Sequence, residues 1–260
     1  MNSAKVTSIR KFLVFTSLII FWEFASRIGW INPFYMPSPW QVVKVIIELF
    51  QDGEIWKHLS ATFFAAVVGI IGGLAIGIVL GFASALTPVI AELLEPIMIM
   101  LNAIPRVILA PLFVIWFGIG IESKIALSLI LVVVLVFFAV YNGIRDVDHR
   151  LVERVQTLGG GKWILLREVY IPSVTAWIIG NLKVAVGFAF TGAVVGEFVG
   201  SSKGLGYLLQ FAQSTYNAAL TISLIILIMA FVMVLFSGAE RIENHLLRWR
   251  PKKRTSEIGS

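Results

Sequence analysis

Apolar residues run through this chain in long stretches that are separated by short polar breaks. Only helices satisfy every backbone group internally when such stretches lie in lipid, and a span needs about 20 residues to cross roughly 30 Å of hydrocarbon. The pattern therefore predicts an all-α membrane protein, with residues 1–260 as one transmembrane domain. Six helices are expected near residues 11–30, 58–86, 90–118, 124–142, 174–199 and 218–239.

The composition agrees with a lipid environment and excludes several classes of protein. Hydrophobic residues make up 58% of the chain and charged residues 14%, whereas a soluble domain carries about 25% charged residues. The chain has no cysteine and three histidines, all outside the apolar runs. We therefore expect no metal site. The spans also lack an acid pair, a Ser–His pair and a zinc-protease motif, so we expect no catalysis by this chain.

The basic residues are placed in a way that predicts an orientation. Three precede the first stretch, five lie between 143 and 173, and six follow residue 239, which makes 14 of the 21. Lys and Arg collect on the cytoplasmic side of membrane proteins. We therefore predict a bacterial inner-membrane protein with both termini in the cytoplasm. Its basic residues are expected to orient it in the lipid bilayer and not to bind nucleic acid. The opposite side holds Arg27, Lys44, Lys57, Lys124 and Lys203.

Two segments carry clear local signals. Residues 37–50 read as a surface helix that begins at Ser38, with Pro39 at its first position and Gln41 completing a capping box. In the second stretch, small residues recur every four positions, which lets helix backbones approach closely in lipid. We call the central set the glycine stripe; it consists of Gly69, Gly73, Gly77 and Gly81.

The longest cytoplasmic connection, 143–173, has the pattern of a helix, a break and a second helix. Three glycines at 159–161 form the break, and we expect Gly159 to adopt a left-handed conformation. Glu153 is expected to cap or pair at the first turn, and Pro172 to end the second helix. Such an element at a cytoplasmic surface is typical of a docking site for a soluble partner.

This connection and two further segments resemble a known family, the permease subunits of binding-protein-dependent ABC importers. The family signature is Glu-Ala-Ala, three residues, Gly, nine residues, Ile-x-Leu-Pro. Glu153, Gly159 and Pro172 stand at those spacings, although Arg154 and Val155 replace the two alanines. The segments PRVILAPLFVIWFGIG (105–120) and VVGEFVGSSKGLGYLL (194–209) are similar to the nitrate/sulfonate/taurine branch.

The resemblance implies the type I ABC importer permease fold, with six transmembrane helices and cytoplasmic coupling helices. It implies two ATP-binding subunits, and these hold ATP and Mg. It also implies a second permease copy in a homodimer and an extracytoplasmic solute-binding protein that docks on 37–50 and 201–217. The permease itself needs no cofactor; its GGGKW run lacks the earlier glycine and the Ser/Thr of a P-loop. Coupling to the ATPase is assigned to Glu153, Arg154, Thr157, Leu158, Gly159, Trp163 and Pro172.

Polar residues within the apolar stretches are candidates for the solute path, because they are costly in lipid. Arg106 follows Pro105 in the third stretch, where a helix break and a cation suit an anionic solute such as nitrate, bicarbonate, a sulfonate or taurine. The alternative is that Arg106 caps the broken helix or contacts lipid head groups. The other candidates are Asn102, Asn181, Lys183, Thr191 and Glu197. For Lys183, snorkelling to the membrane surface is the alternative. For Glu197, the alternative is a gate or interface carboxylate that pairs with Lys203 or with a partner protein. Glu23 and Arg27, four residues apart, are expected to pair with each other.

An ion-coupled secondary transporter is the alternative. It would show inverted repeats with matching broken helices and a carboxylate near the membrane midplane. The sequence shows no such repeat, and its acidic residues lie near the ends of the stretches.

Overall fold

A computed structural model of the protein describes residues 3–248, and in this range it describes no side chains at 3–6, 8 and 106. All of the regular elements are helical, which confirms the all-α prediction over the described residues. The elements are α1 (Ser3–Arg27), α2 (Pro39–Gln51), α3 (Ile55–Leu86), α4 (Pro88–Ala103), α5 (Arg106–Phe117), α6 (Ile121–Arg145), α7 (His149–Thr157), α8 (Lys162–Leu165), a π-helix (Leu166–Tyr170), α9 (Ile171–Gly180), α10 (Leu182–Val199), α11 (Leu205–Ser214) and α12 (Ala218–Leu246).

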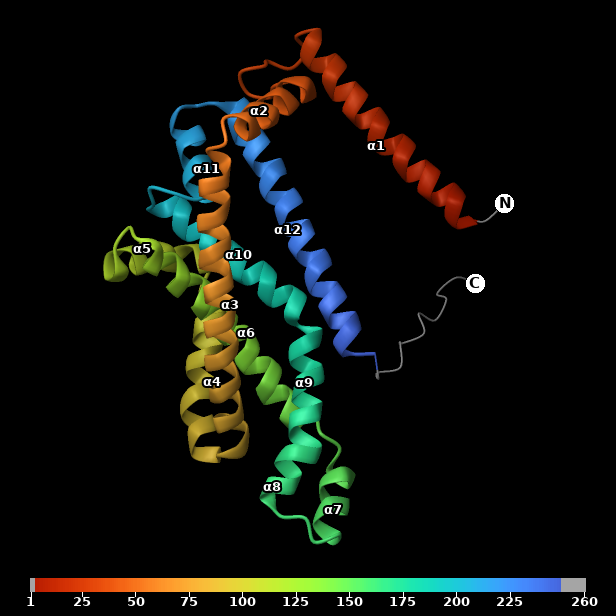
Figure 1. The fold of residues 1–260 in the computed structure, drawn as a ribbon, viewed down its shortest axis with the longest axis vertical. Helices are drawn as coiled ribbons and strands as arrows, with labels where there is room; N and C mark the ends of the chain where they lie inside the picture. Colours follow the sequence, from red (N-terminus) through yellow and green to blue (C-terminus); the bar gives the residue numbers. More distant parts are fainter. Residues whose placement is uncertain (1–2, 249–260) are drawn as a thin grey trace.

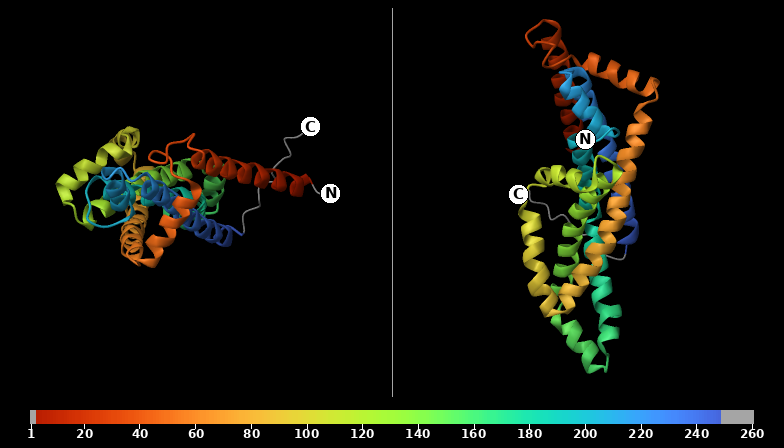
Figure 2. Two further views of the ribbon diagram at one scale, coloured as in Figure 1. Left: turned by 90° about the horizontal axis from the view of Figure 1, so that it is seen from above. Right: turned by 90° about the vertical axis from the view of Figure 1, so that its left-hand side faces the viewer.

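Four of the described helices, α3, α6, α10 and α12, are long and apolar enough to cross a membrane, and there are five crossings if α4 and α5 together form one. Helix α1 occupies the first predicted stretch but is not among these four. Figures 1 and 2 show it leaning away from the body and reaching the rest of the chain through α2. A sixth crossing by 11–30 stays a prediction.

The third predicted span, 90–118, is not a single helix. The chain bends by 109° between α4 and α5. Pro105 lacks a backbone N–H and its ring disfavours the helical conformation in the preceding residue; Ile104 is accordingly extended, with φ −71° and ψ 127°. The break at Pro105 was predicted, but a sharp turn in the chain was not.

The fifth predicted span, 174–199, is also divided. Helix α9 ends at Gly180 and α10 begins at Leu182, with Asn181 between them at φ −101° and ψ 1°. The chain changes direction there, so that α9 extends toward α7 and α8 while α10 turns into the bundle (Figure 1).

Helix α6 is the centre of the bundle, and it packs against α3, α4, α5, α9 and α10. The glycine stripe of α3 lies directly on it. A side chain added at Gly73, Gly77 or Gly81 would place its Cβ 2.5–2.8 Å from the Cβ atom of a valine on α6. The facing residues rise in step, from Ser128 opposite Gly69 to Val140 opposite Gly81, so the two helices run in the same direction. Close packing by the stripe is confirmed.

The two ends of the molecule differ. Helices α2 and α11 lie at one end, and α7 and α8 lie at the other, beyond the turn that joins α3 to α4 (Figure 1). The surface helix α2 forms as predicted. The Ser38 hydroxyl accepts from the Gln41 N–H at 3.3 Å, and the Gln41 side chain accepts from the Ser38 N–H at 3.0 Å.

Two contacts hold α2 in place. The predicted Glu23–Arg27 pair forms at 2.6 Å, and the second oxygen of Glu23 accepts from the Trp40 N–H at 3.0 Å. The buried Ser223 hydroxyl of α12 lies 3.1 Å from the Val42 carbonyl. These contacts fix α2 across the end of α1 and α12, on the face of the protein that carries α11.

Candidate functional site

Residues 148–170 fold into a compact helical hairpin, made of α7, the glycine turn, α8 and the π-helix; we call it the α7–α8 hairpin. The Asp148 side chain caps α7 by accepting from the Arg150 N–H at 2.9 Å. At the other end of α7, the Gly160 N–H donates to Val155 O and the Gly159 N–H to Gln156 O. With Gly159 at φ +80°, this is a Schellman motif, the helix ending that glycine favours. The left-handed glycine and the helix–break–helix pattern are confirmed.

A small core holds the two arms of the hairpin together. Val147, Leu165 and Val169 are buried, and Val152 and Val155 pack against them. The tip carries large apolar side chains that these contacts do not cover. Leu158 is 82% exposed and Trp163 is 72% exposed. The hairpin is therefore ordered by its own core while presenting an apolar tip.

Two local predictions for this segment are wrong. Asp148, and not Glu153, caps α7; Glu153 lies in the middle of the helix, exposed, where its carbonyl accepts from the Thr157 hydroxyl at 2.8 Å. Pro172 does not end the second helix, which continues into α9. The Ile171 N–H donates five residues back to Leu166 O, and this wider π turn accommodates a proline that has no N–H of its own.

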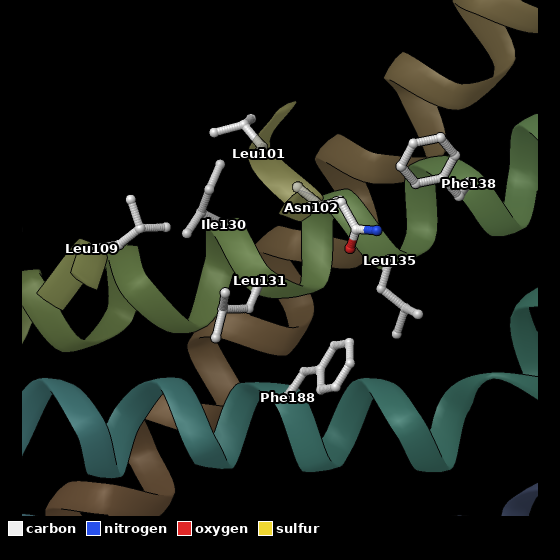
Figure 3. A pocket seen from close by; sticks show the side chains of 9 residues that line it. Leu101, Asn102, Leu109, Ile130, Leu131, Leu135, Phe138 and Phe188 are labelled. Atoms are coloured by element: carbon white, nitrogen blue, oxygen red, sulfur yellow. The ribbon is translucent and has the colours of Figure 1, made fainter. Parts of the chain in front are cut away.

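A cavity lies where α4 and α5 approach α6 and α10 (Figure 3). Its volume is about 220 Å³, and Asn102 from α4 is its one polar lining side chain among the described residues. The apolar lining consists of Leu101, Leu109, Ile130, Leu131, Val134, Leu135, Phe138 and Phe188. Arg106 is the first residue of α5, just after the break; its side chain lies outside the described residues.

Glu197 does not line this cavity. It is buried at the end of α10 near α11, where one carboxylate oxygen accepts from the Thr62 hydroxyl at 2.8 Å and from the Gly206 N–H at 3.0 Å. The Leu205 N–H donates to the Thr62 hydroxyl at 2.9 Å. The predicted pairing with Lys203 is absent among the described contacts. Glu197 therefore anchors the start of α11 to α3 and α10. The sequence position of Glu197 does not reveal these contacts.

The remaining path candidates make contacts within the chain. The Asn181 side chain donates to Trp177 O at 2.8 Å, and the Thr191 hydroxyl donates to Gly187 O at 2.8 Å, both one turn back. Lys183 pairs with Glu240 of α12 at 3.3 Å and lies over the ring of Phe236. Of the predicted polar residues, Asn102 faces the cavity of Figure 3.

No group of three His, Cys, Asp or Glu side chains within the described part of the chain is placed to hold a metal ion.

Residues 73–248 match the family of binding-protein-dependent transport system inner membrane components. The chain belongs to this family. The permease is 32% identical to the formylaminopyrimidine transport permease protein ThiX of Halalkalibacterium halodurans, over 93% of its own length and 96% of that protein's. It is 26% identical to the taurine transport system permease protein TauC of Escherichia coli, over 89% and 86% of the two chains. The predicted nitrate/sulfonate/taurine branch is supported by this relative and by a putative aliphatic sulfonates permease of Bacillus subtilis, at 28% identity over 90% of the permease and 84% of that protein.

Solved structures agree on the fold. The MetNI methionine ABC transporter in an inward-facing conformation matches 81% of the permease and 98% of its own chain, with a TM-score of 0.59 at 19% identity. An amino acid ABC transporter matches 77% and 96%, with a TM-score of 0.63 at 17% identity. The family match begins within α3 and runs through α12, so it includes the cavity, the α7–α8 hairpin and Glu197, whereas Thr62 precedes it.

The sequence reasoning missed several residues of the permease that have defined contacts. Lys124 was placed on the outer surface, yet it is buried, and its ammonium donates to the carbonyls of Ile119 at 2.7 Å and of Gly200. Glu95 lies in the apolar third stretch, and Tyr141 donates to its carboxylate at 2.8 Å. An acidic or basic residue inside an apolar helix was the available signal in both cases.

Proposed function

We propose that this permease forms half of the solute path of an ABC importer, beside a second copy of the same chain. One ATP-binding subunit would dock on the α7–α8 hairpin of each copy and would hold ATP and Mg, so that this chain performs no catalysis itself. The membership in the permease family and the fold of its solved neighbours support this assembly, since both belong to ABC transport systems.

The exposed apolar tip of the hairpin is the observation that carries the proposal. Leu158 and Trp163 are among the most exposed large side chains of the protein, although they lie on a segment with its own core. A large exposed apolar surface marks an interaction site. Arg150, Arg154 and Lys162 are exposed on the same hairpin, so the matching groove on the ATP-binding subunit should be apolar at its centre and acidic at its rim.

The opposite end of the molecule suits the solute-binding protein. Helix α2 and the residues that follow α11 border a hollow of about 550 Å³. Lys44, Glu48, Gln41 and Tyr216 line it together with apolar residues, which is the mixture that a transient protein contact uses. In this arrangement the hairpin faces the cytoplasm with both termini, in agreement with the excess of Lys and Arg on that side.

We propose a small anionic solute, and the proposal rests on the break between α4 and α5. Arg106 begins α5 directly after Pro105, and Asn102 faces the cavity from the last turn of α4. A guanidinium is always charged and suits carboxylate, sulfonate and nitrate groups. Relatives in this family are named for taurine, for aliphatic sulfonates and for formylaminopyrimidine, so the anionic class needs its own test.

Docking is tested with a matched pair of tryptophans. Trp163 and Trp30 are each 72% exposed, at the hairpin and near α2 respectively. The permease would be coexpressed with the ATP-binding subunit, and the amount of ATPase that copurifies would be measured. Trp163→Ala should reduce it strongly, whereas Trp30→Ala should leave it unchanged. Equal copurification with both variants would contradict docking on the hairpin.

The solute is tested in proteoliposomes that hold the assembled importer. Uptake of labelled taurine, an alkanesulfonate, nitrate, bicarbonate and formylaminopyrimidine would be measured with and without ATP. Arg106→Ala should abolish uptake of the anion that is transported. Normal uptake by this variant would remove the basis for an anionic solute. Uptake driven by a proton gradient without ATP would favour the ion-coupled alternative.

A further inference from the structure

Three polar side chains join α4 to the end of α6, next to the α7–α8 hairpin. The Tyr141 hydroxyl donates to the Glu95 carboxylate at 2.8 Å, and the Arg145 guanidinium donates to the Tyr141 hydroxyl oxygen at 3.1 Å. A phenol has one proton to donate and lone pairs to accept with. Tyr141 therefore bridges an acid on α4 and a base on α6 that form no direct ion pair in the described structure.

Packing holds the phenol ring of Tyr141 in place. The residue is 5% exposed, and its ring stacks on that of Phe137 at a centroid distance of 5.7 Å. The guanidinium carbon of Arg145 lies 5.3 Å from the centre of the Tyr141 ring. A buried ring with these two contacts has little freedom to turn, so the hydroxyl is held between Glu95 and Arg145.

At one end, this bridge adjoins the hairpin directly. Arg145 is the last residue of α6. Val147, two residues later, is buried in the core of the hairpin with Leu165 and Val169, and Asp148 caps α7. The chain from the bridge to the hairpin is thus too short to act as a flexible linker.

At the other end, the bridge leads along α4 to the cavity. Glu95, Met98 and Asn102 are spaced by three and four residues, so they lie along one side of the helix. Met98 is buried with Val134 and Phe137 of α6, and Asn102 lines the cavity of Figure 3, as does Val134. One side of α4 therefore runs from the polar bridge at Glu95, past the buried Met98, to the cavity at Asn102.

We propose that Tyr141 is a positioning residue that transmits movement of the α7–α8 hairpin to α4, and so to the cavity at Asn102. The inference rests on the proposed docking of an ATP-binding subunit at the hairpin. When docking displaces the hairpin, the bridge makes α4 follow α6. Without the hydroxyl, only the apolar packing of α4 on α6 couples the two helices, so α4 should follow the hairpin less closely.

The absence of cysteine from the sequence allows a test that does not require the solute. Leu101→Cys places a single thiol of the permease at the cavity. The rate of its labelling by N-ethylmaleimide would be measured in the complete complex with the ATP-binding subunits, in the absence of nucleotide and in the presence of ATP and vanadate. We expect the labelling rate to change with nucleotide, because the cavity changes its access during the cycle.

Adding Tyr141→Phe should reduce this nucleotide-dependent change by about 3–10-fold, the effect of losing one or two hydrogen bonds, while ATP hydrolysis continues. The phenylalanine keeps the ring stacked on Phe137, so the melting temperature of the complex should change little. Glu95→Ala removes the acceptor from α4 and should act in the same way, whereas Glu92→Ala, on the exposed side of the same helix, should not. Because the two variants alter different helices, a folding defect in one leaves the other as a test.

The outcomes separate the two proposals. A labelling change in Tyr141→Phe and Glu95→Ala equal to that of the parent would overturn the linkage. An assembled, ATP-hydrolysing parent complex whose thiol does not respond to nucleotide would also overturn it. Failure of any ATP-binding subunit to associate with the parent would instead overturn the proposed function, and the linkage would fall with it.

Discussion

Replacing Gly73 with alanine should force α3 and α6 apart and destabilise the bundle. The new Cβ would lie 2.5 Å from the Cβ of Val132, 2.7 Å from its Cγ1 and 3.0 Å from the carbonyl oxygen of Leu129. Carbon atoms in contact prefer about 3.5–4.0 Å. The backbone of α3 must therefore withdraw by about 1 Å, because a valine Cβ and a carbonyl oxygen are fixed to α6 and cannot rotate away.

The cost of this separation follows from the length of the contact. The glycine stripe meets α6 from Gly69 to Gly81, a distance of about 18 Å at 1.5 Å per residue. A gap of 0.5–1 Å removes about a quarter to a half of each dispersion contact along it. Overpacking of this kind costs about 1–3 kcal/mol. We expect Gly73→Ala near the upper end, because dispersion is a main attraction between helices in lipid.

The assay is unfolding of the purified permease by sodium dodecyl sulfate, followed by tryptophan fluorescence. Gly238→Ala is the matched control, since Gly238 also lies within a helix, α12, and a Cβ there meets no atom within 4 Å. This control should be neutral or stabilising by about 0.5–1 kcal/mol, because alanine favours a helix over glycine. If both variants unfold at the same detergent concentration, the close approach of α3 and α6 is not what stabilises the bundle.

Three further substitutions test other parts of the molecule. Glu197→Ala should destabilise the permease by about 1–3 kcal/mol for each donor left without an acceptor, whereas Lys203→Ala should have no effect in the same unfolding assay; a similar loss in both would contradict the anchoring role. Gly159→Ala should reduce the folding free energy of the hairpin by about 1–2 kcal/mol, because Gly159 has a positive φ, and it should lower the amount of ATPase that copurifies. Gly161→Ala should do neither, because Gly161 has a φ of −79° and free space around it. Ser38→Ala should cost about 1 kcal/mol through loss of the cap, seen as faster amide hydrogen exchange in α2 only; unchanged exchange there would refute the cap.

Features set by neighbouring residues could be predicted from the sequence. The capping box at Ser38 and the left-handed Gly159 depend on contacts within six residues, and both formed as expected. The repeated four-residue spacing of the glycine stripe predicted close packing against another helix. Its partner α6 lies about 60 residues further along the chain, and the pattern of α3 alone does not identify it.

Several contacts in the fold could not be read from the sequence. Glu197 was predicted to lie on the solute path or to pair with Lys203 or a partner protein. In the fold, α3 and α11 cover it and supply the Thr62 and Gly206 donors. Apolar length alone predicts a straight span at 90–118, whereas the turn at Pro105 depends on how α5 packs against α6 and α10. Asn181, Thr191 and Lys183 were chosen as path candidates for their polarity, and their place on the solute path stays a prediction. Only the fold shows that their side chains already have partners within the chain.

The pairing of α3 with α6 has a consequence for biosynthesis. Because both helices run in the same direction, residues 88–120 must first carry the chain back across the bundle before α6 can reach its place. The glycine stripe of α3 therefore lies in the lipid without its partner until about 60 more residues have been synthesised. Chains that stop before Ser128 lack every α6 residue that packs on the glycine stripe, so the glycine face of α3 stays uncovered in them.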